Sequence, residues 1–290
     1  MITLSANESE LNEIRARVPV RIMDFEIDPM LVRDALPEVF PAYGISMTLP
    51  YLEPYLVRTM RDALKHCTDE KIAQEVRQFI GQEAQHYRQH AVLNDLIRSV
   101  SPEMEGLRNI EEQMEADYQR FSKTKSLKFN LAYAEGFEAA TFAGGRANFQ
   151  NKVFDRLETI QGTDLLRLFV WHALEEVEHS TVTFNIYDHL LGNYFYRLVA
   201  GTYGPYHFFK YVFLFSKFIA QNAPQALEQG HALMPSKSLL GSWEEQLSLL
   251  GAIAKVYLPG YNPAKIPIPN NVAYYSEGYA NEAREIRTMK

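Results

Sequence analysis

Apolar residues recur every three or four positions along most of this chain, which is the period of a helix with one buried face. The pattern predicts five long helices, at about 50–67, 69–100, 103–122, 126–157 and 164–191. The third carries many charges and is expected to be an exposed connector. An aromatic-rich helical stretch over about 194–221 and a shorter helix over 242–257 complete the pattern.

The two ends of the chain differ from this regular middle. Residues 1–45 hold short mixed patterns and prolines, and 259–290 begin with the proline-rich run "PGYNPAKIPIPNN". We therefore expect an irregular N-terminal arm and a C-terminal tail that wraps the surface. Because no strand-like run occurs, the fold class is predicted to be all-α, with one domain over 1–290. Within it, 46–191 form the bundle core and 192–258 the aromatic-rich helices.

Acids and imidazoles interrupt the apolar stripe of two predicted helices. Positions i, i+4 and i+7 share one helical face. The interrupting residues are His172, Glu176 and His179 in the helix 164–191, and Glu83, His86 and His90 in the helix 69–100. Apolar residues continue the same line above and below each trio. Both helices thus carry a Glu-x-x-His motif on a face that is expected to be buried.

A buried carboxylate without a partner costs several kcal/mol or more, and a divalent metal supplies the compensating charge. In four-helix di-metal proteins two helices contribute Glu-x-x-His and the other two contribute one Glu each. The helix 50–67 offers Glu53. The helix 126–157 offers Glu135 and Glu138, and we prefer Glu135 because it shares a face with apolar neighbours. Glu138 stays open as a second-shell group or as the true ligand.

A Glu-x-x-His motif alone is weak evidence, since the chain contains a third one. Glu228 and His231 match it, but Gly230 and Pro235 break the helical context there, and we ascribe that match to chance. The opposing interpretation is an ordinary bundle with surface carboxylates and core histidines that bond to the backbone. It suffices for one histidine, but for the whole set it would leave several buried charges unpaired.

Charge and composition exclude several other classes of protein. The formal net charge of −7 argues against nucleic-acid binding. A single cysteine, Cys67, excludes a disulfide framework and agrees with a reducing cytoplasm. The N-terminus lacks the pattern of a signal peptide. The most apolar stretch, 198–216, contains glycines, a proline, a histidine and a lysine, so a transmembrane helix is not expected.

At these residues the sequence resembles a bacterial family described as predicted metal-dependent hydrolases, within the ferritin-like superfamily. The resemblance rests on "VRIMDFEID", "LPYLEPYLVRTMR", "EVRQFIGQEAQHYRQH", "WHALEEVEHSTVTFNIY" and "YLPGYNPA". It implies a ferritin-like four-helix bundle with extra C-terminal helices, and it implies a metal more firmly than it implies hydrolysis. The trio around Glu176 also resembles that of di-iron N-oxygenases acting on aryl amines, which have one additional histidine. Carried over by position, the metal ligands would be Glu53, Glu83, His86, Glu135, His172, Glu176 and His179.

Carboxylate and imidazole ligands without thiolates suit iron or manganese. We expect two iron ions, with manganese or a mixed iron–manganese pair as substitutes. The first functional hypothesis is an oxygenase, in which two ferrous ions activate O2 and oxidise a small, hydrophobic organic substrate. Glu83 and Glu176 would lie at its catalytic centre. The sequence does not identify the electron donor.

Three other functional hypotheses remain open. A metal pair could activate water for hydrolysis. The chain could be a ferroxidase or iron-binding protein, although the aromatic C-terminal third would then have no explanation. It could also be a metal-free interaction protein.

The aromatic stretch 194–221 and the second shell complete the sequence-based picture. The simplest account of the stretch is core packing. It could also line an apolar substrate tunnel or rest on a membrane surface, which would make a cytoplasmic protein peripheral to the membrane. A homodimer through this surface is a further alternative. His90 and Tyr87 are candidates for a second shell or a substrate pocket.

Overall fold

The computed structural model describes residues 18–233 and 243–288, and within these ranges the regular structure is helical, with no strand. The prediction of an all-α fold is therefore confirmed for this part of the chain. The long helices are α3 (Phe40–Leu64), α4 (Glu70–Ser99), α5 (Leu107–Thr124), α6 (Leu127–Gln150), α7 (Asp164–Glu178), α10 (Tyr203–Asn222), α13 (Trp243–Lys255) and α14 (Asn271–Thr288). Shorter ones are α2 (Pro29–Arg33), α8 (Val182–Leu190), α9 (Tyr194–Tyr196) and α11 (Pro224–Gln229).

Helix starts follow from local capping chemistry. The Asp69 side chain accepts hydrogen bonds from two backbone N–H groups in the first turn of α4. Ser126 caps α6 and Thr163 caps α7 in the same way. Such side chains satisfy N–H groups that have no partner inside the helix. The structure thus agrees with the predicted starts of these three helices to within a residue or two.

Four expectations about the elements need correction. Helix α3 begins at Phe40, so Pro50 and Pro54 lie inside it and the arm is shorter than 1–45; residues 1–17 lie outside the described ranges. The expected helix 164–191 is interrupted at His179–Thr181, between α7 and α8. Helix α5 is no exposed connector, because it packs against α3 and α10 and buries several large side chains. The C-terminal tail contains a regular helix, α14.

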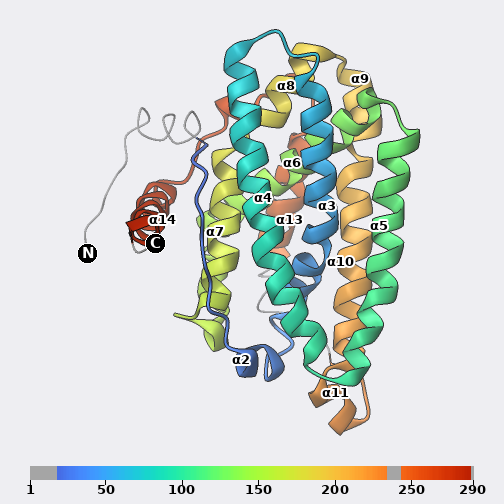
Figure 1. Cartoon of the computed structure of the whole chain (residues 1–290), viewed down its shortest axis with the longest axis vertical. Coiled ribbons are helices and arrows are strands. Elements are labelled where there is room, and N and C mark those ends of the chain that lie inside the picture. The colour runs from blue at the N-terminus through green and yellow to red at the C-terminus, as the bar shows by residue number, and fades with distance from the viewer. Residues whose placement is uncertain (1–17, 234–242, 289–290) are drawn as a thin grey trace.

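Four helices surround the interior in which the predicted polar residues lie. Helix α3 packs along α4, α6 packs against α7, and α3 also contacts α6. Figure 1 shows α3 and α4 side by side, with α7 beyond α4 and with α10 and α5 on the far side of α3. The arrangement directs one face of each of these four helices toward a shared centre.

The aromatic C-terminal part joins this core through a close backbone contact. A π-helical turn, Arg197–Gly201, lies against α6. At Gly136 of α6 an added Cβ would be 2.1 Å from the backbone oxygen of Gly201, so only glycine permits this approach. None of the described helices has the length and apolar character needed to cross a lipid bilayer.

Candidate metal centre

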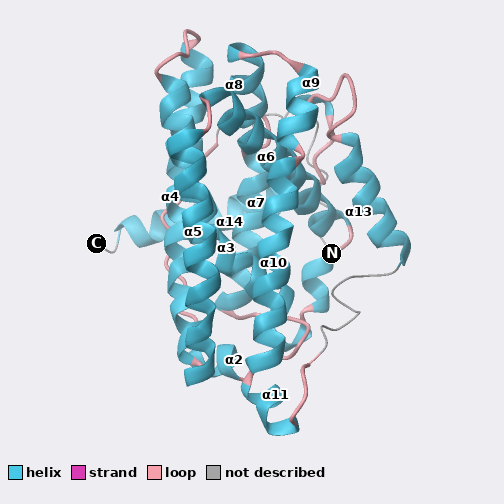
Figure 2. Ribbon diagram, turned by 90° about the vertical axis from the view of Figure 1, so that its right-hand side faces the viewer, coloured by secondary structure: helices cyan, strands magenta, loops and turns pink. Residues whose placement is uncertain are grey.

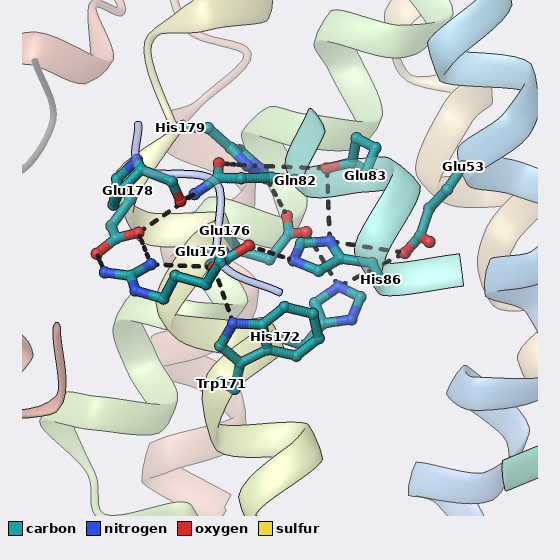
Figure 3. Close-up of polar contacts among 12 residues, drawn as sticks. Glu53, Gln82, Glu83, His86, Trp171, His172, Glu175, Glu176, Glu178 and His179 are labelled. Atoms are coloured by element: carbon teal, nitrogen blue, oxygen red, sulfur yellow. Dashed lines mark hydrogen bonds and ion pairs between the residues drawn. The ribbon is translucent and has the colours of Figure 1, made fainter. Parts of the chain in front are cut away.

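Six of the predicted residues form two adjacent triads in the interior. One triad is Glu53 of α3, His86 of α4 and His172 of α7. The other is Glu83 of α4 with Glu176 and His179, which lie at the end of α7. Within each triad one ligand atom per residue lies within 4.8 Å of the others. Figure 3 shows Glu53 reaching His86 from α3, opposite the side chains of α7.

Two carboxylates connect the triads. Glu83 Oε1 lies 3.6 Å from His86 Nδ1 and 3.7 Å from His179 Nδ1. The Glu176 carboxylate lies 3.0 Å from His172 Nε2 and 3.5 Å from His179 Nε2. Each therefore stands between a histidine of one triad and the histidine of the other. This is the position from which a carboxylate can bridge two cations.

Helix α6 contributes Glu138 to this site, and it does not contribute Glu135. Glu138 Oε2 lies 3.0 Å from His179 Nε2. The Glu135 carboxylate is turned away and pairs with Arg197, at 2.8 Å between Oε2 and Nε. The sequence-based preference for Glu135 as a ligand therefore does not fit the geometry, and the alternative, Glu138, does. Arg197 belongs to the π-helical turn. Because its positive charge compensates the Glu135 carboxylate, Glu135 can be buried without a metal.

The outward nitrogen of His86 is held by a second carboxylate. His86 Nε2 donates to Glu175 Oε2 at 3.0 Å, and its Nδ1 faces Glu53 and Glu83. Metal-binding histidines commonly donate their other N–H to a carboxylate in this way, which fixes the tautomer and the ring orientation.

The same arrangement recurs at His179. Its Nδ1 donates to Gln82 Oε1 at 3.0 Å, and its Nε2 faces Glu138 and Glu176. Although burial lowers the pKa of His179, the charge of Glu176 and the contact with Glu138 raise it well above its usual value, so without a cation Nε2 holds a proton between these carboxylates. Metal ligands must be deprotonated, so a shared cation would take the place of this proton.

His172 is held by a chain of hydrogen bonds that leads away from the site. Its Nδ1 lies 2.9 Å from His90 Nε2, and His90 Nδ1 lies 2.9 Å from Ser46 Oγ. Ser46 Oγ donates to Asn94 Oδ1 at 2.7 Å. On its other side His172 Nε2 hydrogen-bonds to Glu176 Oε1 at 3.0 Å, so both ring nitrogens fix the orientation of this imidazole. His90, a candidate for a second shell or a substrate pocket, thus contacts His172, whereas no described contact joins the half-buried Tyr87 to the triads.

A buried network beyond Glu175 was not predicted from the sequence. Arg21 donates to Glu175 at 2.9 Å and to both oxygens of Glu178 at 2.7 and 2.8 Å. Trp171 Nε1 donates to Glu175 at 2.8 Å, and Gln82 Nε2 donates to Glu178 at 3.3 Å. The available signal was the acid-rich "EEVE" run within a helix that is otherwise apolar. Its partner, Arg21, is separated from it by most of the chain.

Electrostatics show that, without a cation, the site must be neutralised by protons. Burial lowers the pKa of His86, but hydrogen bonds to Glu175 and Glu83 raise it to about 10. Burial raises the pKa of Glu53 well above its usual range, and the charges of Glu83, Glu176 and Glu138 raise it further. Burial and the charge of Glu176 raise the pKa of Glu138 to about 8. Burial and the neighbouring His86 lower the pKa of His172, which favours the neutral imidazole that binds metals.

Several ligand atoms are also buried without a hydrogen bond from any described residue. They are both oxygens of Glu53 and of Glu138, Glu83 Oε1, Glu176 Oε2, His86 Nδ1 and His179 Nε2. Buried polar atoms of this kind are rare unless an ion or water completes them. All of these atoms are carboxylate oxygens or imidazole nitrogens, which bind divalent cations. Without thiolates such a set suits iron, manganese or zinc.

The third Glu-x-x-His motif does not form a comparable site. Glu228 and His231 are exposed on and after α11, and neither belongs to a group of ligand residues within the described ranges. The interpretation of this motif as a chance match is consistent with that geometry.

Comparison with known proteins adds one finding. A family model described as "Predicted metal-dependent hydrolase" matches residues 24–266. That range contains both triads and Glu138. A search of curated proteins and a search of solved structures each gave no match.

Proposed function

This chain belongs to the family of predicted metal-dependent hydrolases, as the resemblance in its sequence indicates, and from that premise we propose that it is an enzyme with a two-cation centre. Glu53, His86 and His172 would hold one cation. Glu138 and His179 would hold the other, with Glu83 and Glu176 between the two. The observation that carries the proposal is that three imidazoles and three carboxylates converge in the interior as two adjacent triads, with the Glu138 carboxylate 3.0 Å from His179.

Hydrolysis is the reaction that the family description favours. When bound, a pair of divalent cations supplies Lewis acidity, which lowers the pKa of water and stabilises a developing oxyanion. The chain's own residues supply position. Glu175 and Gln82 orient the rings of His86 and His179, and His90 holds His172 through its Nδ1. Substrate would be a compound with a hydrolysable carbonyl or phosphoryl group.

Aromatic rings limit the access of water to the histidines. The ring of Trp171 lies edge-on to His86, with 4.9 Å between centroids, and Phe79 packs on His179 at 4.8 Å. His172 and Glu176 are the least buried members, with side chains 12% and 7% exposed. We expect small molecules to enter on the side of His172 and Glu176.

Oxidation by O2 is the second candidate, and a specific observation favours it. One Glu comes from each of α3 and α6, and a Glu-x-x-His motif comes from each of α4 and α7. This distribution is that of ferritin-like di-iron carboxylate bundles, so we propose the ferritin-like arrangement for these four helices. A small, hydrophobic substrate and two iron ions would then be required.

One set of measurements separates the candidates. The chain is loaded anaerobically with iron(II), manganese(II) or zinc, and metal content, ester, amide and phosphoester hydrolysis, and O2 consumption are measured. Hydrolysis predicts turnover without O2 and with more than one metal. Oxidation predicts O2 consumption with reduced iron alone. Uptake of many irons per chain would indicate storage instead, and failure to bind any of the metals would refute both proposals.

The matched variants are His86→Ala and His231→Ala. His86 belongs to the first triad, whereas His231 is exposed outside it. Loss of a metal ion in His86→Ala with full metal content in His231→Ala is the expected result. Equal metal content in both variants would contradict the ligand assignment.

A further inference from the structure

One outer face of the aromatic C-terminal helices is apolar and uncovered. α9, the π-helical turn and α10 form a continuous column, which faces the viewer in Figure 2. Five side chains along its outer side are between 50% and 77% exposed: Phe195, Val199, Tyr206, Phe209 and Phe213. Their spacing of three, four or seven positions places them on one side of the helix. At 1.5 Å per residue the row is about 27 Å long.

The charges around this row are unusual for the chain. Although the net charge is −7, no aspartate or glutamate occurs between Asp188 and Glu228. Lys210 and Lys217 are exposed on the same side of α10 as Phe209 and Phe213. The protein, although acidic overall, is therefore neutral to positively charged on this face.

The acid that hydrogen-bonds to α10 within the described residues, Asp117, is already paired with a cation. Asp117 of α5 accepts hydrogen bonds from Tyr211 at 2.8 Å and from Arg120 at 2.6 Å. It also pairs with His207 at 3.2 Å. Its charge is thus directed into the α5–α10 contact and does not offset the two lysines.

The composition of the face indicates the kind of partner. Lysine is depleted in the centres of protein–protein interfaces. At a lipid interface, in contrast, aromatic rings enter the boundary between head groups and acyl chains, and lysines extend to the head groups. Anionic lipid complements a face that has lysines and lacks acids.

We propose that this face docks the protein on the surface of an anionic membrane, with Phe209 and Phe213 inserted at the lipid interface. Docking by one outer face requires neither a transmembrane helix nor a change in the buried metal centre. It would bring the chain close to apolar molecules dissolved in the bilayer.

The test is co-sedimentation of the full chain with lipid vesicles. One set contains phosphatidylglycerol and phosphatidylcholine in equal parts, and the other contains phosphatidylcholine alone. The double variant Phe209→Ser/Phe213→Ser removes the apolar contact. The control, Leu247→Ser/Leu250→Ser, removes two similarly exposed side chains from α13, whose first turn contains two acids. The variant Lys210→Glu/Lys217→Glu tests the charge.

We expect the unmodified chain to partition onto the anionic vesicles. The phenylalanine variant should lower the partition coefficient by at least about tenfold, because two apolar side chains no longer leave water. The control should match the unmodified chain. The lysine variant should lose roughly tenfold or more of its preference for anionic over neutral vesicles. Thermal unfolding midpoints should stay within a few degrees of the original, since all these residues are exposed.

Three results would overturn the proposal. The first is no partition of the unmodified chain onto either kind of vesicle. The second is equal partition of the phenylalanine variant and the unmodified chain. The third is a dimer in sedimentation equilibrium that the phenylalanine variant dissociates, because a second copy of the chain would then cover the face. None of these measurements depends on metal or on turnover.

Discussion

Glu175 allows the role of the outer hydrogen bonds to be tested apart from the ligands themselves. Its carboxylate is fully buried and accepts from His86, Trp171 and Arg21. In the variant Glu175→Gln the volume is kept, but one oxygen is replaced by an amide that cannot accept a hydrogen bond. At least one of the three donors then loses its partner, and His86 is no longer held by a charge.

The expected effect on metal binding follows from this contact. Removal of a carboxylate that orients a metal-binding histidine lowers metal affinity by about 10- to 100-fold. That range corresponds to about 1.4–2.8 kcal/mol of binding free energy. The loss should fall mainly on one of the two cations, because Glu175 contacts His86 and makes no described contact with His179.

Glu178→Gln is the matched control. Glu178 lies on the same helix, is equally buried and also binds Arg21, but it does not touch a histidine of the triads. It reaches His179 only through Gln82, which the backbone oxygen of Pro19 also holds at 3.0 Å. We expect Glu178→Gln to lower the free energy of unfolding while metal affinity stays within about threefold of the original, well short of the second-shell effect.

The assay is competition with a chromophoric chelator, with iron(II) under anaerobic conditions and with manganese(II). Chemical denaturation of each variant measures stability separately. Unchanged affinity in Glu175→Gln would refute the argument that this carboxylate orients His86. Equal loss of affinity in both variants would show that the effect comes from general loosening of the Arg21 network.

Three further outcomes are expected. Glu138→Ala should remove one cation per chain in metal analysis, and full metal content in this variant would contradict the site. Glu135→Ala should keep both cations but lower the free energy of unfolding by about 3–5 kcal/mol, because Arg197 is left buried without its partner. Gly136→Ala should lower the free energy of unfolding by about 1–3 kcal/mol, because the added Cβ would meet a backbone oxygen. Gly144→Ala on the same helix adds its Cβ to open space and should leave stability unchanged or raise it. Equal melting temperatures of the two variants would contradict this. Finally, metal at about 100 times its Kd should add about 2.7 kcal/mol to the free energy of unfolding, and a chelator should reverse this change; a melting temperature that does not respond to metal would count against a cation in the core.

The sequence was sufficient where a helix has one buried side. α4 and α7 each place Glu-x-x-His on an apolar stripe, and the structure brings Glu83, His86, Glu176 and His179 together. The predicted starts of these two helices also agree with the structure, in which Asp69 and Thr163 cap them. The break after α7 was not predicted, because the helical period continues through His179–Thr181 in the sequence.

Partners distant in sequence could not be predicted in the same way. Arg21 reaches Glu178 across a separation of 157 residues, and Arg197 reaches Glu135 from the π-helical turn. A single sequence shows that Glu175 and Glu178 are acids within an apolar helix. It does not show which cation neutralises them, because that depends on how an irregular segment crosses the helices.

The sequence could not decide between Glu135 and Glu138 for a reason that lies in α6 itself. The stripe argument assumes that apolar neighbours mark the side of a helix that faces the core. In α6, however, every residue from 130 to 140 is buried, because α7 and α3 cover one side and α10 and the π-helical turn cover the other. Three helical residues turn by about 300°, so the two carboxylates point only about 60° apart. Apolar neighbours therefore surround both, and the decisive difference is that Arg197 lies on one side and His179 on the other.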